Sequence, residues 1–471
     1  MNYYKFHLFF ILILISNSNL FANKTIVFTP NNNDLVIPAS PISTAAPLGQ
    51  IHGQIRYFFS TTQNALGLKS DFANALGLYA KYESVKKFGF QFAMSGYYVF
   101  NIGSSDLSKP DSTTKQFNRY ELGLFEIDQP KNKDEMYKIE EFYARYNYKK
   151  STFTIGQQII NTPFINPQDG RMRPTAIDGI WFQYRSPKKI ELDMGWIYGV
   201  SPRSTSRFMT VGQSIGIYPS GIQSSGLKSN YTSNIYSEGI AIIGIKTFFD
   251  KNFEFQIWNL YVSSVFNTLM FQTDYKFFVK ENSNYYFSLQ CIQQKSIGNG
   301  GNIDPTKTYF EKGKNSLVLG SRIGWKNNNT DFSMNYTRIA ADGKYLMPRE
   351  WGKDPFFTFL PRERNEGLGD VNALVFKLSQ NFPKINLKSS FGLGRYQLPD
   401  VKNYELNKYS MPSYTQLNFD LKYKFPKKLY HFEANTLLVA KFNNGNTYDN
   451  PKFYYNKVDM FLINFVLLYN F

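Results

Sequence analysis

Large apolar residues alternate with polar or small residues along many segments of about ten residues. The same two-residue period runs through 87–100, 189–200 and 415–425. In the last segment an apolar series alternates with a polar one: Leu417, Phe419, Leu421, Tyr423 and Phe425 against Asn418, Asp420, Lys422 and Lys424. A period of two places one series on each face of a β-strand. Segments of this length and pattern are typical of transmembrane barrel strands, although a soluble β-sandwich also alternates.

The connections between these segments separate the two architectures. Short, turn-rich links such as 85–87 and 426–428 alternate with long connections such as 101–137 and 340–369. Strands that run up and down through an outer membrane require this order, with short periplasmic turns and long extracellular loops. The pattern therefore predicts an all-β fold, a transmembrane antiparallel β-barrel of about 18 strands.

The chain divides into three expected parts. Lys5, the apolar run 8–15 and the site Leu20-Phe21-Ala22 predict a cleaved signal peptide over residues 1–22, because the run is too short to span a bilayer as a helix. Residues 23–52 contain four prolines up to residue 50 without alternation and are predicted to be a periplasmic lead-in. The barrel is expected over 53–471.

The carboxy-terminal strand adds a signal of its own. Apolar residues alternate up to the last residue: Phe461, Ile463, Phe465, Leu467, Tyr469 and Phe471. A final strand that ends in phenylalanine resembles the assembly signal of bacterial outer-membrane barrels. We therefore expect Phe471 to bind the barrel-assembly machinery and the protein to reside in the bacterial outer membrane. Its expected partners there are outer-membrane lipids and lipopolysaccharide.

Composition agrees with this fold and excludes several kinds of chemistry. The 471 residues are 18% aromatic, yet the mean hydropathy is −0.37, so the rings must be segregated to one face of the strands. Cys291 is the single cysteine and there are only three histidines, so we expect no disulfide, metal site or cofactor. The net charge of +17 is dispersed without a nucleic-acid-binding module, so no nucleic-acid partner is expected.

Two stretches of the chain resemble the OprD-type outer-membrane porins. The first runs from Phe153-Thr154-Ile155-Gly156-Gln157-Gln158 through Asn161-Thr162-Pro163-Phe164 to Asp169-Gly170-Arg171-Met172-Arg173-Pro174. The second is Trp351-Gly352-Lys353-Asp354-Pro355-Phe356-Phe357-Thr358 with Pro361-Arg362-Glu363-Arg364. The resemblance implies 18 strands and a pore narrowed by inward folding of the third and seventh loops, here 160–176 and 340–369.

Both loops carry residues suited to a constriction, because arginine presents a forked set of donors to carboxylates. The candidate constriction residues are Asp169, Arg171, Arg173, Arg349, Arg362 and Arg364. If the apolar face of each strand meets lipid, further arginines line the pore: Arg145, Arg185, Arg322 and Arg395. Arg338 shares a face with Phe332, Met334 and Tyr336, which favours a position at a membrane rim.

The sequence thus predicts a porin, a non-enzymatic passive diffusion channel for small polar or charged solutes, including carboxylate-bearing amino acids or organic acids. The residues leave open whether it is a monomer or a homo-oligomer. One alternative is an outer-membrane enzyme of the lipase or protease type, for which His52 and His431 are the only candidate bases in the mature chain. The other alternative is a structural or adhesive barrel.

Overall fold

The computed structural model describes residues 48–471 except 119, 129–134, 169, 188 and 364. The chain separates into two units, Met1–Ile37 and Pro38–Phe471, and only the second contains described residues. The expected signal peptide, and the expected lead-in up to residue 47, lie outside the described part.

Nearly all regular structure in the described part is β-strand. The strands are β1 (Gly49–Gln63), β2 (Asp71–Ser84), β3 (Phe90–Asn101), β4 (Glu135–Tyr148), β5 (Ser151–Gln158), β6 (Ala176–Ser186), β7 (Ile190–Ser201), β8 (Met209–Thr210), β9 (Ile240–Phe248), β10 (Phe253–Val262), β11 (Phe266–Phe277), β12 (Ser283–Ser296), β13 (Asn315–Asn327), β14 (Thr330–Ile339), β15 (Val371–Phe382), β16 (Leu387–Gln397), β17 (Tyr414–Lys424), β18 (Phe432–Asn443) and β19 (Met460–Asn470). The remaining elements are short 3-10 turns: η1 (Leu122–Leu124), η2 (Pro305–Lys307), η3 (Pro383–Ile385), η4 (Lys427–Leu429) and η5 (Pro451–Phe453). Within the described residues, no helix has the length and apolarity to cross a membrane.

The strands form one closed antiparallel barrel. Each pairs with its neighbours in chain order, and the ladder closes where β1 meets β19, from Gln54 opposite Asn470 to Gln63 opposite Phe461. The sheet has 19 strands, but the two-residue β8 pairs only with the end of β7, so 19 − 1 = 18 strands build the wall. The predicted barrel and its strand number are confirmed. β1 begins at Gly49, somewhat ahead of the expected barrel start at residue 53.

Alternation along each strand sets the two faces of the wall. In β12, Phe287 and Leu289 are 39% and 46% exposed on the outer face, whereas Ser288 and Gln290 are buried on the inner face. Lipid accepts the apolar series, and the polar series faces a lumen where water and loop backbone supply hydrogen-bond partners. This geometry explains why the chain is 18% aromatic yet has a mean hydropathy of only −0.37.

A β-bulge in β4 breaks the alternation at one point. Ser95 of β3 pairs with Glu141 and Gly96 pairs with Ile139, so Glu140 is the extra residue in the ladder. A single extra residue makes two successive side chains point to the same face of the sheet. Glu140 and Glu141 therefore both point inward. The bulge thereby brings two adjacent carboxylates into the lumen.

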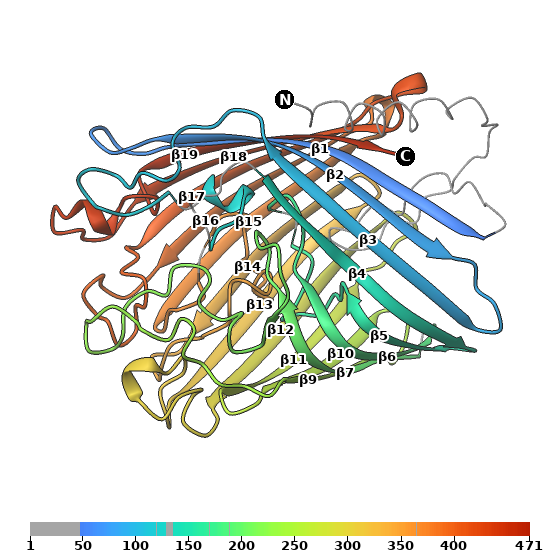
Figure 1. Cartoon of the computed structure of the whole chain (residues 1–471), viewed down its shortest axis with the longest axis horizontal. Coiled ribbons are helices and arrows are strands. Elements are labelled where there is room, and N and C mark those ends of the chain that lie inside the picture. Colours follow the sequence, from blue (N-terminus) through green and yellow to red (C-terminus); the bar gives the residue numbers. More distant parts are fainter. Residues whose placement is uncertain (1–47, 119, 129–134, 169, 188, 364) are drawn as a thin grey trace, which may run out of the picture. The chain divides into compact units, whose positions relative to one another are not determined.

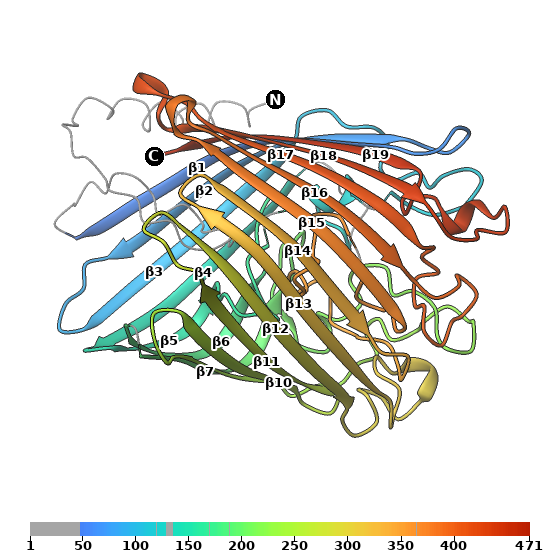
Figure 2. The same cartoon turned by 180° about the vertical axis from the view of Figure 1, so that it is seen from behind.

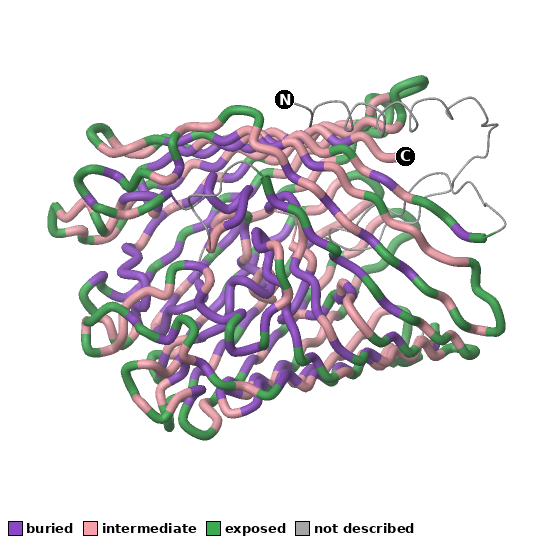
Figure 3. The backbone as a smooth tube through the Cα atoms, viewed as in Figure 1, coloured by how far each residue is buried: buried purple, intermediate pink, exposed green. Residues whose placement is uncertain are grey.

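The two ends of the barrel differ. Short turns join the strands at one end, and long loops emerge at the other and fold back into the barrel (Figures 1 and 2). The largest buried cluster joins inward strand residues such as Phe266 and Val375 to loop residues such as Phe164, Tyr345 and Trp351. Figure 3 shows the buried residues gathered inside the loop-bearing half. The core of this protein therefore lies in its lumen.

Trp351 joins the seventh loop to this core, and its removal tests how far the loop depends on one contact. The ring is fully buried, stacks on Phe266 with centroids 6.4 Å apart, and donates from Nε1 to Ser214 Oγ at 3.0 Å. We expect Trp351→Ala to cost about 3–5 kcal/mol locally. Limited trypsin digestion should then cut within 340–370 faster, while the closed barrel keeps its heat-modifiable migration on gels. Unchanged protease resistance of this loop would contradict the assignment.

Candidate functional site

The seventh loop, 340–370, lies against the inner wall of the barrel. Its carbonyls accept hydrogen bonds from inward side chains of β12, β15 and β17: Gln290 to Pro355 at 3.1 Å, Lys377 to Phe357 at 2.7 Å and Gln416 to Pro361 at 2.9 Å. Irregular backbone is tolerated at membrane depth when such partners satisfy it. The inward fold of this loop agrees with the expectation from sequence.

The third loop, 159–175, is fastened to the seventh. The Asn166 backbone N–H donates to the Trp351 carbonyl at 3.1 Å, and its side-chain amide makes a reciprocal pair with the Lys353 backbone at 3.0 and 3.1 Å. Gly352 permits this approach, because a Cβ there would lie 2.5 Å from the Asn166 side chain. The two loops therefore cross the lumen as one joined unit.

Three arginines meet where the third, fourth and seventh loops converge. Arg171 comes from the third loop, Arg203 from the fourth loop (202–239) and Arg362 from the seventh. Burial and repulsion, first from Arg171 and more weakly from Arg203, lower the pKa of Arg362. Among the described residues, the buried Nε atom of each of the three has no hydrogen-bond partner. We call Arg171, Arg203 and Arg362 the arginine cluster.

The surroundings of the arginine cluster leave it with excess positive charge. Glu121 is the nearby carboxylate, and its oxygens already accept from Ser60 at 2.9 Å, Thr62 at 2.7 Å and Asn118 at 2.6 Å. Other partners of the cluster are neutral groups: Arg203 donates to the Gln168 side chain and to the Arg349 carbonyl, and the Arg362 guanidinium lies 5.5 Å from the Tyr120 ring centroid. The Arg203 guanidinium lies 5.8 Å from that of Tyr218. Arg171 and Arg362 thus share one carboxylate whose hydrogen-bonding capacity is largely used, and Arg203 adds a third cation beside them.

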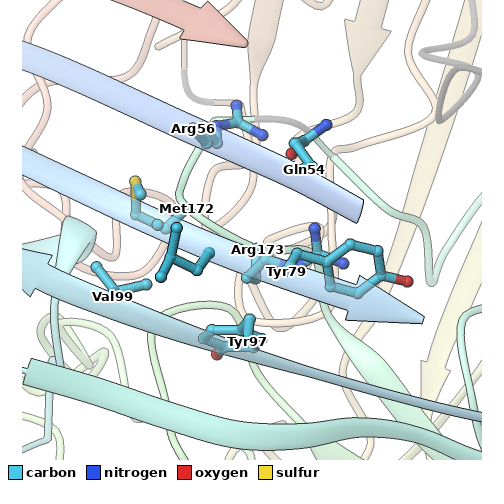
Figure 4. A pocket seen from close by; sticks show the side chains of 9 residues that line it. Gln54, Arg56, Tyr79, Tyr97, Val99, Met172 and Arg173 are labelled. Atoms are coloured by element: carbon cyan, nitrogen blue, oxygen red, sulfur yellow. The ribbon is translucent and has the colours of Figure 1, made fainter. Parts of the chain in front are cut away.

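Arg173 has a different environment from the arginine cluster. It forms an ion pair with Glu140, the bulge residue, and its guanidinium lies 3.9 Å from the Tyr79 ring centroid. Figure 4 shows Arg173 beside Tyr79 in a pocket that Arg56 and Tyr97 also line. Its charge is therefore balanced locally, and its role is to hold the end of the third loop against the wall.

Arg349 belongs to a third group, buried below the surface of the loops. Its guanidinium lies 5.2 Å from the Tyr409 ring centroid; burial lowers the pKa of Arg349, but Tyr409, Glu366 and Glu350 together raise it above its usual value. Lys408 adds a second cation 3.8 Å from Glu366. Mixed charges of this kind fasten loops together. Arg349 is linked to the arginine cluster only through its carbonyl, which accepts from Arg203 at 2.7 Å.

Of the remaining candidates, Asp169 and Arg364 lie outside the described residues, three arginines point to the lumen, and Arg395 differs from both sets. Arg145, Arg185 and Arg322 point to the lumen and form ion pairs with Glu83 at 3.7 Å, Asp193 at 2.7 Å and Asp274 at 2.7 Å. A role in conduction stays a prediction for all five of these residues.

Arg395 corrects the sequence interpretation, because it points outward. It shares the exposed face of β16 with Phe391 and Leu393. The inward positions of β16 are Gly392 and Gly394, and a Cβ at Gly392 would lie 2.6 Å from Leu360 of the seventh loop. The need to admit this loop gives the inner face to glycine and leaves the arginine on the outer face.

Three features of the site went unnoticed in the sequence. Arg203 lies in a long loop with no family-like motif, and no feature of the sequence signals the bulge that turns both Glu140 and Glu141 inward. Lys388 and Lys422 sit at directly paired positions on the inner face of β16 and β17. The strict alternation in 415–425 already indicates that Lys422 points inward, because it lies on the same face as Asp420.

The comparisons with known proteins agree with this geometry. The family model of the OprD outer-membrane porins matches residues 104–357. This chain belongs to the OprD family. No curated protein matches it. The OprD-family match places the protein in the bacterial outer membrane as a channel protein.

Solved structures of low sequence identity share the fold. OccK9 (OpdG) of Pseudomonas aeruginosa is 11% identical with a TM-score of 0.70, covering 90% of this chain and 98% of that one. OccAB3 of Acinetobacter baumannii is 14% identical with a TM-score of 0.69, covering 90% and 99%. OpdK of Pseudomonas aeruginosa, solved with vanillate, is 13% identical with a TM-score of 0.67, covering 89% and 98%.

The described residues contain no group of three histidine, cysteine, aspartate or glutamate side chains arranged to hold a metal ion.

Two acidic residues of the seventh loop have strongly shifted pKa values. Burial and repulsion from Glu366 raise the pKa of Asp354 to about 8. Burial and repulsion from Asp354 raise the pKa of Glu363 well above its usual range, and neither of its oxygens has a hydrogen-bond partner among the described residues.

These acids predict a pH-dependent selectivity. Asp354 is neutral below its pKa and gains negative charge as the pH rises through about 8, so anion preference should fall between about pH 7 and about pH 9. Reversal potentials in a salt gradient across a planar bilayer measure this change. Asp354→Asn should make the change smaller, and the remainder comes from buried cations that lose charge over the same range, among them Lys408, whose pKa burial lowers to about 8, and Arg362, whose pKa burial and Arg171 lower to about 9. Equal pH profiles of the two proteins would contradict the assignment.

Proposed function

We propose that this OprD-family porin is a passive diffusion channel for small solutes that carry a carboxylate, such as amino acids or organic acids. The observation that carries the proposal is the arginine cluster, which gathers three cations at the crossing of the inward loops. A carboxylate entering there gains forked, charge-assisted hydrogen bonds and relieves the mutual repulsion of the guanidinium groups. Selection then acts by size at the loops and by charge at the cluster.

The inner wall below the loops supports the same direction of selectivity. Lys377, Lys388 and Lys422 follow one another on the inward faces of β15, β16 and β17. On β2, β6 and β9, by contrast, inward cations are matched by acids, in the pairs Lys81–Glu141 at 3.0 Å, Arg185–Asp193 at 2.7 Å and Lys246–Glu254 at 2.8 Å. These three lysines outnumber Asp420, the inward acid of β17 beside them, so this side of the lumen offers an anion a path away from the arginine cluster toward the periplasmic end.

One structural relative supports a carboxylate substrate. OpdK was solved with vanillate, an aromatic carboxylate. Glu363 and Asp354 add acidic groups near the same crossing, and an ammonium group would find them when they are ionised. Zwitterionic amino acids therefore suit the site as well as simple organic acids.

Catalysis is not part of the proposal. His431, one of the two histidines considered as a base, lies with Nδ1 2.6 Å from the carbonyl of Asn470 and its ring 3.9 Å from that of Tyr430. It serves to anchor the end of the chain. OprD-family proteins are channels, and the arrangement needs no covalent step.

We also propose the route by which the protein reaches the membrane. Residues 1–22 are a signal peptide removed during export, and the terminal strand with Phe471 is read by the barrel-assembly machinery. Gly53 and Phe471 exchange backbone hydrogen bonds of 2.7 and 3.0 Å, so the chain end is also the seam that closes the barrel. Assembly into a homo-oligomer remains compatible with this route.

Charge reversal in the arginine cluster tests the channel. Arg171→Glu and Arg362→Glu should each move the reversal potential toward cations, because each exchanges one positive charge for a negative one beside two remaining arginines. Uptake of small carboxylates by proteoliposomes, followed by swelling, should slow several-fold relative to neutral sugars of similar size.

Lys428→Glu provides the matched control, since it makes the same charge change in an exposed periplasmic turn. It should leave selectivity almost unchanged because solvent screens exposed charges over about 10 Å. A complete lack of conductance by the wild-type protein would refute the channel. Conductance whose selectivity ignores both arginine substitutions would refute the arginine cluster as its filter.

A further inference from the structure

The outer surface of the barrel carries very few charged side chains, and the cations among them are concentrated on one side. At outward positions of the described strands, the basic residues are Lys295 of β12, Arg338 of β14 and Arg395 of β16. The acidic ones are Glu135 and Asp178, on β4 and β6. A charge that faces lipid is costly unless it lies at the interface with a partner. An anionic ligand at the interface would offset the cost of placing these grouped cations toward lipid.

All three cations lie at the same level of the wall. Each is within two residues of the end of its strand, as β12 ends at Ser296, β14 at Ile339 and β16 at Gln397. Long loops follow at each of these ends, so this is the extracellular rim. One strand separates each cation from the next, a lateral spacing of about 10 Å. We call Lys295, Arg338 and Arg395 the basic rim.

Register and hydrogen bonds show how the basic rim is held. Arg338 pairs with Leu319 and Asn372 in the ladder, and Arg395 pairs with Leu374 two residues farther along β15. Arg338 makes an ion pair of 2.6 Å with Asp370, yet its side chain stays 32% exposed. Arg395 is exposed and donates to Thr415 at 3.3 Å. Among the described residues Asp370 is the one acid that forms an ion pair with the basic rim, so the rim keeps a net positive charge.

Below the basic rim the wall offers a surface for acyl chains. Leucines project outward on β12, β13, β15 and β16 with 36% to 48% exposure: Leu289, Leu319, Leu374 and Leu393. At the opposite, periplasmic ends of β12, β14 and β16 the outward residues are the uncharged Ser283, Thr330 and Leu387. The ligand therefore has phosphate or another anion at the outer interface and hydrocarbon beneath it.

We propose that the basic rim binds the phosphorylated headgroup of lipopolysaccharide, with its acyl chains lying on the leucines of β12 to β16. The lipid A disaccharide carries phosphate groups at its ends, and these match cations spread along the rim. Arginine binds phosphate through paired donors, and lysine adds a point charge. This site lies on the outside of the barrel and is independent of the solute that passes through the lumen.

Binding of purified lipid A in detergent tests the proposal, measured with a fluorescent label on the protein. The wild type should bind diphosphoryl lipid A about ten-fold more tightly than dephosphorylated lipid A of the same acylation, as expected when three exposed ion pairs each add a few-fold. The triple variant Lys295→Gln, Arg338→Gln, Arg395→Gln should lose this preference. Inorganic phosphate in excess should fail to displace lipid A, because it lacks the acyl chains.

The matched control is Lys251→Gln, Lys384→Gln, Lys428→Gln, which removes the same charge from exposed periplasmic turns. It should keep the preference, and both variants should conduct like the wild type, which separates this proposal from the proposed channel function. No preference for the phosphorylated lipid, or equal preference in the rim variant, would overturn the proposal. So would a loss of self-association in the rim variant without a change in lipid A binding, since a second copy would then be the occupant.

Discussion

The structure depends on one constraint: lipid offers no partner to a backbone N–H or carbonyl group. A sheet in a membrane must therefore satisfy every ladder position within itself, and the only way to do so is to close. Closure here joins β1 to β19 and uses the last residue of the chain, through the hydrogen bonds between Gly53 and Phe471. The alternation of outward rings and inward polar groups follows, because a closed wall has one dry face and one wet face.

The wet face changes the meaning of a hydrophobic core. Packing inside this barrel is provided by loops that fold inward, with Trp351 and Phe164 against strand residues such as Phe266. Backbone carbonyls of these loops need hydrogen-bond donors, and inward glutamine and lysine side chains of the wall donate to them. Polar residues of the strands thus serve two purposes, as they line the water path and hold the loops that narrow it.

Charge is distributed differently at three depths. Ion pairs such as Arg185–Asp193 neutralise much of the strand wall, the loop crossing concentrates Arg171, Arg203 and Arg362, and the outer rim keeps cations toward lipid. The net charge of +17 therefore has no single role. Cations act on solutes only where acids fail to balance them, which is why Arg173 beside Glu140 differs from Arg171, although the two residues are close in sequence.

Much of this could be predicted because it is local. The two-residue period determined the strands, the order of short and long links determined the barrel, and family-like motifs pointed to Arg171 and Arg362. Only the tertiary structure decided the rest. The bulge at Glu140 adds one residue that turns two adjacent carboxylates inward, and Arg395 points outward because Gly392 and Gly394 take the inner face of β16 beside the seventh loop. Arg203 joined the cluster because loops distant in sequence meet in the lumen. A sequence records the pattern of a strand, whereas contacts across the barrel arise only when the sheet closes.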